Sequence, residues 1–291
     1  MERRPLLSVI ILTYNEEVNL PACLESLKGL DCEIFVVDSG STDRTVEIAR
    51  SYGAHVVEHP FENYAAQRNW AQSNLPLSGE WVFHIDAGER VSPELADSLS
   101  RFFTGGPHDE IDGLLVSRRT IFLGRWLRHG AMYPVYHLRV FRKDKGWCED
   151  RQNDQHFVVN GKVHKLKGDL IDIVTEDLDS WTLRHVRWAR LEADELMRRR
   201  PVGSSGRGVR ARLTGNPIER RRWLRNLYYR MPLFLRALGF FCYHYFFRLG
   251  FLDGIEGLIF WTLRGFWYRF YLDAKLYEAR RRSEVHKVPG G

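Results

Sequence analysis

Two stretches decide the fold of this chain: VVDSGSTD at residues 36–43 and WVFHIDAGE at residues 81–89. Each is an apolar run that ends in a carboxylate, Asp38 or Asp86, and then turns. In an open parallel sheet, ligands bind just beyond the carboxyl ends of the strands, so two acids placed there face the same ligand. Asp38 is then placed to hydrogen-bond a base or a ribose. Asp86 is placed to hold a divalent cation against a diphosphate, because hard cations prefer carboxylate oxygens.

Strand and helix patterns alternate around these two stretches. Apolar, β-branched runs predict strands at residues 7–13, 33–38, 54–58 and 81–86, with helices between them. Ser41 or Thr42 is expected to cap a helix that runs through Arg50. Ser92-Pro93 is expected to start another helix, since proline is tolerated in a first turn. This alternation predicts a doubly wound α/β sheet.

The pattern changes beyond residue 103, where aromatic residues, glycines and charges are mixed. We expect residues 1–103 and residues 104–200 to form the two halves of one domain that spans residues 1–200. Proline, glycine and serine after residue 200 predict a linker over residues 201–215. Residues 216–291 are expected to form a helical tail that associates with a membrane.

The tail is rich in aromatic residues and arginine but has no uninterrupted apolar stretch of the about 20 residues that a spanning helix needs. Aromatic residues alternating with arginines are typical of helices that lie in the headgroup layer. Two alternatives remain: a helical hairpin that packs its aromatic residues in a core, and a spanning hairpin. Interfacial contact with an anionic membrane surface is the prediction.

Charge and cysteine content constrain the partners and the compartment. The net charge is +6, and twelve arginines but a single acid, Glu219, lie between Arg198 and Arg236. Such a block predicts an anionic partner, namely a membrane surface, nucleic acid or a phosphorylated substrate, or else a solvated face. The four cysteines lack metal-ligand spacing and fit reduced thiols in a cytosolic protein. The apolar run at residues 6–12 is expected to be a buried strand rather than a signal peptide.

Three motifs in order carry a family resemblance: SVIILTYNEE at residues 8–17, VDSGSTD at residues 37–43 and PFENYAAQRNWA at residues 60–71. Together they resemble family 2 glycosyltransferases of the GT-A fold. The third is similar to the branch that includes lipopolysaccharide-core and exopolysaccharide transferases. The resemblance covers roughly residues 6–170, and it implies that residues 1–103 are a nucleotide-binding half and residues 104–200 the acceptor and catalytic half. It implies an α/β fold of GT-A type, with a doubly wound, mostly parallel, Rossmann-like sheet followed by the helical, arginine-rich tail.

The resemblance implies a set of donor-binding residues. They are Thr13, Asn15, Glu16, Asp38, Arg68, Asp86 and Ala87. The first four would lie near the donor base and ribose, and Arg68 would face the donor phosphates, which a guanidinium binds through paired donors. The alternatives are that Asp38 caps the helix that starts near Thr42, and that Arg68 forms a surface salt bridge.

The resemblance also implies a metal site at Asp86. The family commonly has Asp-Ala-Asp followed by Glu, whose carboxylates bind Mg²⁺ or Mn²⁺ against the donor diphosphate. This chain has Asp86-Ala87-Gly88-Glu89, so the second aspartate is missing. Either Glu89 supplies the second ligand, or Asp86 holds the ion with water and phosphate oxygens, or the site is weakened or absent.

An inverting transfer needs a general base, which related transferases carry in a His-Glu-His element. The matching segment here is residues 149–156, with Gln155 where glutamate is expected. Asp154 is the first choice of base, followed by Asp150 and Glu149, while His156 would orient the base or bind phosphate. Arg139 and Arg142 are assigned to the acceptor side or to an ordinary surface.

The leading functional hypothesis is an inverting glycosyltransferase. It would use a nucleotide-sugar donor, with a UDP-sugar favoured, and a lipid-linked or polysaccharide acceptor. It would act in the cytoplasm as a peripheral protein on the inner face of the cell membrane. The alternative is a catalytically degenerate member that binds nucleotide or glycan, for which Gly88 and Gln155 argue. The third and least favoured hypothesis is a nucleic-acid binder built on the arginine block. The prediction is that the protein has no nucleic-acid partner.

Overall fold

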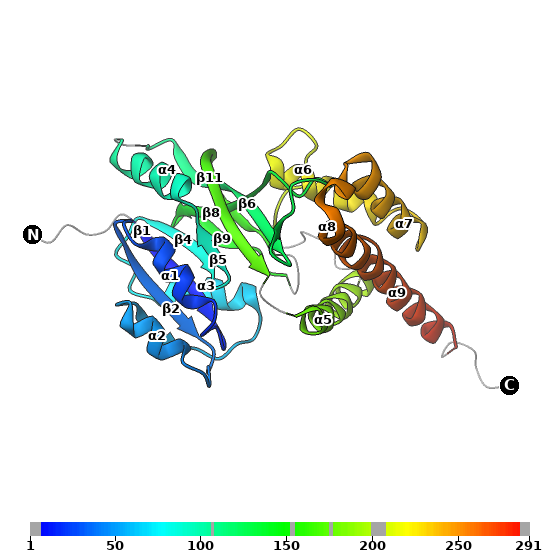
Figure 1. The fold of residues 1–291 in the computed structure, drawn as a ribbon, viewed down its shortest axis with the longest axis horizontal. Helices are drawn as coiled ribbons and strands as arrows, with labels where there is room; N and C mark the ends of the chain where they lie inside the picture. Colours follow the sequence, from blue (N-terminus) through cyan, green and yellow to red (C-terminus); the bar gives the residue numbers. More distant parts are fainter. Residues whose placement is uncertain (1–6, 106–107, 152–154, 175–176, 199–207, 286–291) are drawn as a thin grey trace, which may run out of the picture. The chain divides into compact units, whose positions relative to one another are not determined.

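The computed structural model describes residues 7–105, 108–151, 155–174, 177–198 and 208–285. The chain divides into two compact units (Figure 1). The first comprises residues 1–124 and 134–175, and the second comprises residues 125–133 and 176–291. Residues 199–207 lie outside the described part, so the expected domain boundary at residue 200 and the start of the linker stay predictions.

A mixed sheet in the order β3-β2-β1-β4-β8-β6-β11-β5 forms the centre of the first unit. Its strands are β1 (Leu7–Thr13), β2 (Cys32–Asp38), β3 (His55–Glu58), β4 (Trp81–Asp86), β5 (Glu89–Val91), β6 (Ile111–Phe122), β8 (Val135–Arg142) and β11 (Lys162–Val174). The first four in this order are parallel neighbours, and β6 and β11 are also parallel. Strand β8 runs antiparallel to both β4 and β6. A separate hairpin joins β9 (Gly146–Cys148) to β10 (Phe157–Val159).

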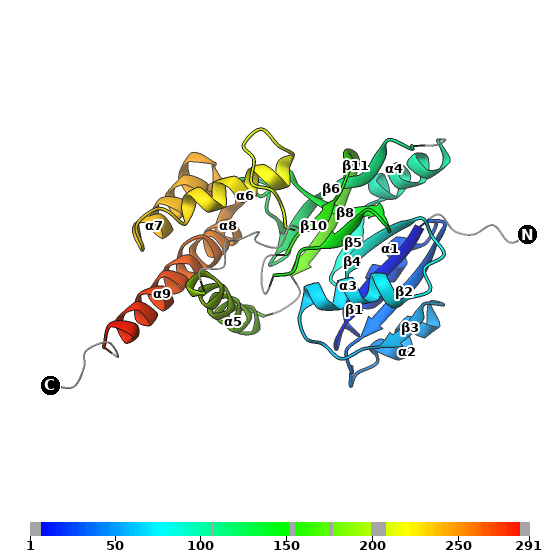
Figure 2. The same cartoon turned by 180° about the vertical axis from the view of Figure 1, so that it is seen from behind.

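Helices cover both faces of the parallel strands. They are α1 (Leu20–Leu27), α2 (Thr45–Ser51), α3 (Tyr64–Asn74) and α4 (Pro93–Thr104). Helices α1, α2 and α4 pack on the face that carries Val9 and Ile11, and α3 packs on the face that carries Ile10 (Figure 2). Alternate residues of β1 are thus buried on opposite sides, as expected of a strand inside a doubly wound sheet. The predicted α/β fold with a mostly parallel sheet is confirmed.

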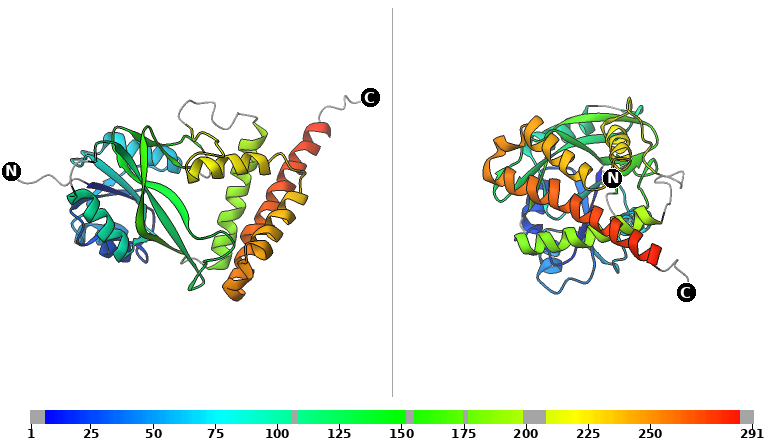
Figure 3. Two further views of the ribbon diagram at one scale, coloured as in Figure 1. Left: turned by 90° about the horizontal axis from the view of Figure 1, so that it is seen from above. Right: turned by 90° about the vertical axis from the view of Figure 1, so that its right-hand side faces the viewer.

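The second unit consists mainly of helices. Its elements are β7 (Arg125–Trp126), α5 (Leu178–Met197), α6 (Pro217–Tyr228), α7 (Leu235–Cys242), the π-helical turn η1 (Tyr243–Phe247), the 3-10 turn η2 (Gly250–Asp253), α8 (Gly254–Phe260), the π-helical segment η3 (Trp261–Trp267) and α9 (Tyr268–Val285). Helix α8 continues through η3 into α9 (Figure 1). Helix α5 packs along α9, with Ala189 and Ala193 against Leu272 and Leu276 (Figure 3). Among the described residues, no helix combines the length and the apolar character that crossing a bilayer requires.

Buried charge fixes the start of α7 against α9. The Arg236 guanidinium donates to Asp273 Oδ1 through Nε at 2.8 Å and through Nη2 at 2.5 Å. The second oxygen of Asp273 accepts the backbone N–H of Phe234 at 2.7 Å. The side chains of Arg236 and Asp273 are 3% and 0% exposed. Because neither charge has access to water, each depends on the other for compensation.

Replacing Arg236 with alanine is therefore expected to lower the free energy of unfolding of the second unit by about 3–5 kcal/mol, because Asp273 is left charged and buried. Urea denaturation followed by tryptophan fluorescence measures the change. The control is Arg230→Ala, at an exposed position two residues after Tyr228, the last residue of α6, where a loss within about 0.5 kcal/mol is expected. Equal losses in the two variants would contradict the assignment.

Candidate active site

The predicted site residues meet at the carboxyl edge of the parallel strands. The register places Thr13 of β1 opposite Asp38 of β2. On its other side, β1 pairs with β4, and Leu12 lies opposite Asp86. The two acids therefore end strands that flank β1, and they lie at the edge where open α/β sheets bind ligands.

Asp38 is held inside the turn that follows β2. One oxygen accepts the hydroxyls of Thr13 at 2.9 Å and Ser41 at 2.6 Å. The other accepts the backbone N–H groups of Gly40 at 3.0 Å and Ser41 at 2.8 Å. The residue is 2% exposed. Asp38 thus fixes the turn, and α2 begins later than the sequence predicted, at Thr45 rather than near Thr42.

Asn15 and Glu16 tie the loop after β1 to the loop after β2. The Asn15 backbone N–H donates to Ser41 Oγ at 2.8 Å, and the Asn15 side-chain carbonyl accepts the Thr42 N–H at 2.8 Å. The Glu16 N–H donates to Thr45 Oγ1 at 2.7 Å. Asn15 has a φ of 54°, a left-handed conformation that asparagine tolerates better than most residues. These hydrogen bonds join the two loops into one continuous surface at the carboxyl edge of the sheet.

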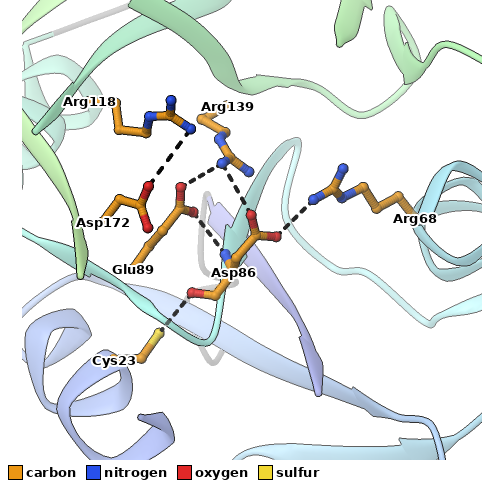
Figure 4. A network of polar contacts seen from close by, with 7 residues as sticks. All are labelled: Cys23, Arg68, Asp86, Glu89, Arg118, Arg139 and Asp172. Atoms are coloured by element: carbon orange, nitrogen blue, oxygen red, sulfur yellow. Dashed lines mark hydrogen bonds and ion pairs between the residues drawn. The ribbon is translucent and has the colours of Figure 1, made fainter. Parts of the chain in front are cut away.

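Asp86 lies between two guanidinium groups (Figure 4). Arg68 of α3 donates to Asp86 Oδ1 at 2.8 Å, and Arg139 of β8 donates to Asp86 Oδ2 at 3.3 Å. Arg139 also donates to Glu89 Oε1 at 2.6 Å, while Glu89 Oε2 accepts the Asp86 backbone N–H at 2.9 Å. The Asp86 side chain is 44% exposed, whereas that of Glu89 is 3% exposed. Asp86 is thus the carboxylate of this motif that a ligand can reach.

Opposite effects act on the two carboxyl groups. Burial acts to raise the pKa of Asp86, but the charges of Arg68 and Arg139 hold that pKa well below its usual range. Burial raises the pKa of Glu89 to about 7, with the carboxylates of Asp86 and Asp172 adding to the rise and Arg139 opposing it. Arg68 and Arg139 therefore balance the charges of Asp86 and Glu89, so that the cluster has no net negative charge. Such a cluster does not repel an anionic ligand.

The acids of this motif fit a metal ion through Asp86 alone. Guanidinium groups contact both oxygens of Asp86, but its side chain is 44% exposed, whereas that of Glu89 is only 3% exposed. Position 88 has no side chain, although a Cβ built there would meet only Ile173 O, at 3.8 Å. Across the described ranges, no cluster of three or more His, Cys, Asp or Glu is placed for a metal ion. One protein carboxylate is nonetheless sufficient for magnesium, which commonly keeps waters and takes phosphate oxygens as further ligands.

The segment expected to carry the base forms the loop between β9 and β10. Glu149 Oε1 accepts the His156 N–H at 3.0 Å, and the Glu149 N–H donates to the His156 carbonyl at 2.9 Å. Glu149 is 2% exposed and Asp150 is exposed. Asp154 lies outside the described residues. Glu149 and His156 therefore hold the two ends of this loop together. The choice of general base stays a prediction.

Helix α3 connects this loop to the Asp86 cluster. The Asn69 side chain donates to the Cys148 carbonyl at 2.9 Å and accepts the Cys148 N–H at 2.9 Å. The neighbouring Arg68 lies with its guanidinium carbon 5.4 Å from the centre of the Phe157 ring. The helix that carries Arg68 to Asp86 thus also positions both ends of the loop.

Two residues of the site were missed by the sequence analysis. Arg139 was assigned to the acceptor side, but it is 7% exposed and binds Asp86 and Glu89. An arginine inside the apolar strand VYHLRVFR is the signal that could have revealed it, because a buried guanidinium needs acidic partners. Gln67 is 1% exposed and joins the ends of β2 and β3 by donating to Ser39 Oγ at 3.2 Å and to the His59 carbonyl at 3.0 Å. Ala87 is buried in the main core.

Comparisons with known proteins agree with this geometry. The model of the family "Glycosyl transferase family 2" matches residues 8–162. The lipopolysaccharide core biosynthesis glycosyltransferase LpsC of Rhizobium meliloti is 32% identical over 196 residues, which cover 65% of this chain and 71% of that protein. An uncharacterized glycosyltransferase of Rickettsia prowazekii is 38% identical over 103 residues, 35% of each chain.

A solved structure shares the fold. The mannosyltransferase PcManGT from Pyrobaculum calidifontis, in complex with GDP-Man and Mn²⁺, superposes with a TM-score of 0.52 at 15% identity, over 98% of this chain and 89% of that chain. Identity this low supports the fold alone, whereas the family model and LpsC support the family. The chain therefore belongs to glycosyl transferase family 2 and is a glycosyltransferase of the GT-A fold.

Proposed function

We propose that this protein transfers a sugar, with inversion, from a nucleotide-diphosphate donor to a lipid-linked or polysaccharide acceptor of the cell envelope. The observation that carries the proposal is the pair of guanidinium groups that meets Asp86 at the carboxyl edge of the sheet. The name of LpsC, a lipopolysaccharide core biosynthesis enzyme, supports an envelope acceptor. A UDP-sugar is the favoured donor.

In this proposal Arg68 and Arg139 stabilise the leaving diphosphate. Guanidinium groups present paired donors that match phosphate oxygens, and donors fixed before the reaction need no reorganisation as charge develops. Asp86 holds both groups at one point of the sheet edge, and Glu89 holds Arg139 from the buried side. A Mg²⁺ or Mn²⁺ ion bound at Asp86 would add Lewis-acid stabilisation of the same diphosphate.

The acceptor hydroxyl must lose a proton, and the loop between β9 and β10 is the proposed source of the base. Asp154 is the first candidate and Asp150 the second. Glu149 ranks last, because its carboxylate already accepts the His156 N–H at 3.0 Å and is buried.

We also propose that the protein works at the inner face of the cell membrane, with an anionic lipid surface as partner. The support is the arginine and aromatic content of the second unit. Arginines near an anionic leaflet each contribute about 1 kcal/mol to binding.

Replacing Arg139 or Asp86 with alanine is expected to lower kcat about a hundredfold or more, because the donors that face the leaving group are lost or displaced. The measurement is release of nucleoside diphosphate by the purified protein with its acceptor. The control is Arg90→Ala, next to Glu89 on β5, which should keep most of the activity. A wild-type protein that binds nucleotide but never turns over would favour the degenerate alternative, which Gly88 and Gln155 suggest.

The metal prediction can be tested by restoring the missing acid. The backbone at Gly88 has room for a Cβ, whose nearest neighbour would be Ile173 O at 3.8 Å, so Gly88→Asp is a suitable variant. We expect it to raise the affinity for Mn²⁺ at least about tenfold, since a second carboxylate joins Asp86. Calorimetric titration with Mn²⁺ measures the affinity for the ion. Titrations with UDP, GDP, dTDP and CMP, each in the presence and absence of Mn²⁺, measure whether nucleotide binding depends on it. Gly88→Asn is the matched control. Equal affinity in both variants would argue against an ion at Asp86.

Asp154→Asn is expected to lower kcat by about a hundredfold or more with little change in donor affinity, because the acceptor hydroxyl loses its base. Asp150→Asn in the same loop is the comparison. If Asp154→Asn turns over at the wild-type rate, the base moves to Asp150 or Glu149.

A further inference from the structure

The turn that joins α7 to α8 carries a concentrated set of exposed apolar side chains. We call residues 243–258 the hairpin tip. Its exposed large apolar residues are Tyr243, Phe246, Phe247, Leu249, Phe251, Leu252, Ile255 and Leu258. Phe247 is 79% exposed and Ile255 is 71% exposed. Single exposed apolar residues are ordinary, but a concentration of this kind marks a surface that binds a protein or a membrane.

The charges of the hairpin tip distinguish between partners. Arg248 is exposed. Asp253 is 2% exposed and accepts the His129 N–H at 2.9 Å, with His129 Nδ1 at 2.7 Å from its other oxygen. Glu256 lies 3.7 Å from the Arg125 guanidinium. Asp253 is thus buried and hydrogen-bonded, and Glu256 is paired with Arg125, so the exposed charged residue of the tip is the cation Arg248, which complements an anionic surface.

The hairpin tip is also built to keep its shape. The Gly130 N–H donates to the Arg248 carbonyl at 2.8 Å, and His244 Nδ1 lies 2.7 Å from the Gly130 carbonyl. The His244 ring stacks on Trp261 with centroids 4.9 Å apart. A Cβ at Gly250 would lie 2.7 Å from Trp261 Nε1, so glycine is required for this close approach. The exposed side chains therefore cannot fold back into the space that Trp261 and His244 fill.

We propose that the hairpin tip inserts its apolar side chains into the headgroup layer of an anionic phospholipid bilayer, with Arg248 binding lipid phosphates. The choice of an anionic bilayer rests on the proposed function. The exposed aromatic and aliphatic side chains supply the apolar contact, and the arginine supplies the electrostatic attraction, as in proteins that lie on a membrane without crossing it. The contact is made by the hairpin tip, which consists of the short turns η1 and η2 and the start of α8, rather than by one long amphipathic helix.

Flotation of the full-length protein with phosphatidylcholine vesicles, with and without phosphatidylglycerol, tests the proposal. The protein should float, and more strongly with phosphatidylglycerol. Phe247→Ser combined with Ile255→Ser should lower the partition coefficient about a hundredfold, because two side chains that enter the bilayer are removed. Arg248→Gln should lower it about fivefold and only on anionic vesicles. Both serine substitutions are at highly exposed positions and leave the packing of the unit unchanged.

The matched control is Leu183→Ser on α5, a position that is 59% exposed in the same unit but outside the hairpin tip. It should bind vesicles like the unmodified protein. Flotation of the double variant at the unmodified level would overturn the proposal. A second outcome would also overturn it: the unmodified protein fails to float and sediments as a dimer, and the double variant sediments as a monomer. The tip would then bind a second copy of the chain. Nucleotide binding by each variant is measured by calorimetry. If vesicle binding is lost while nucleotide binding is kept, the membrane proposal and the proposed transferase function are tested separately.

Discussion

Two guanidinium groups converge on one carboxylate, Asp86, and the candidate site depends on that contact. Arg68 comes from α3, on one face of the sheet, and Arg139 from β8, the strand that runs antiparallel to β4. Both arginines are largely buried, at 9% and 7% exposure. Removing Asp86 would leave two desolvated cations close to each other, so the acid organises the cluster.

The parts of the fold and of the site that the sequence could predict are those with a local signal. Asp38 and Asp86 were identified because an apolar run ends at each of them, and the helix after Ser92 was predicted correctly because its cap and proline are local signals. Arg68 was identified through the resemblance of its motif. Each of these signals lies within a few neighbouring residues, and the alternation of strands and helices predicts that the strands are mostly parallel.

The parts that could not be predicted depend on contacts between distant segments. Arg139 reaches Asp86 across 53 positions because β8 enters the sheet beside β4, and no periodicity in the sequence shows which strands will pair. The late start of α2 has a similar cause. Asn15 accepts the Thr42 N–H across 27 positions, so tertiary hydrogen bonds hold residues that local cap signals assigned to the helix.

Glycine at position 88 changes how the site balances its charge. Two carboxylates and a divalent ion sum to zero, and so do Asp86, ionised Glu89, Arg68 and Arg139. In the second arrangement the cations are part of the chain and are fixed by folding, since Arg139 is held at 2.6 Å by Glu89, whose side chain is 3% exposed. A second aspartate near this cluster would add a negative charge that the arginines do not compensate, and would therefore favour a bound cation. The absence of that aspartate and the presence of buried Arg139 are thus consistent features of one site, in which the chain itself supplies the positive charge that balances Asp86 and Glu89.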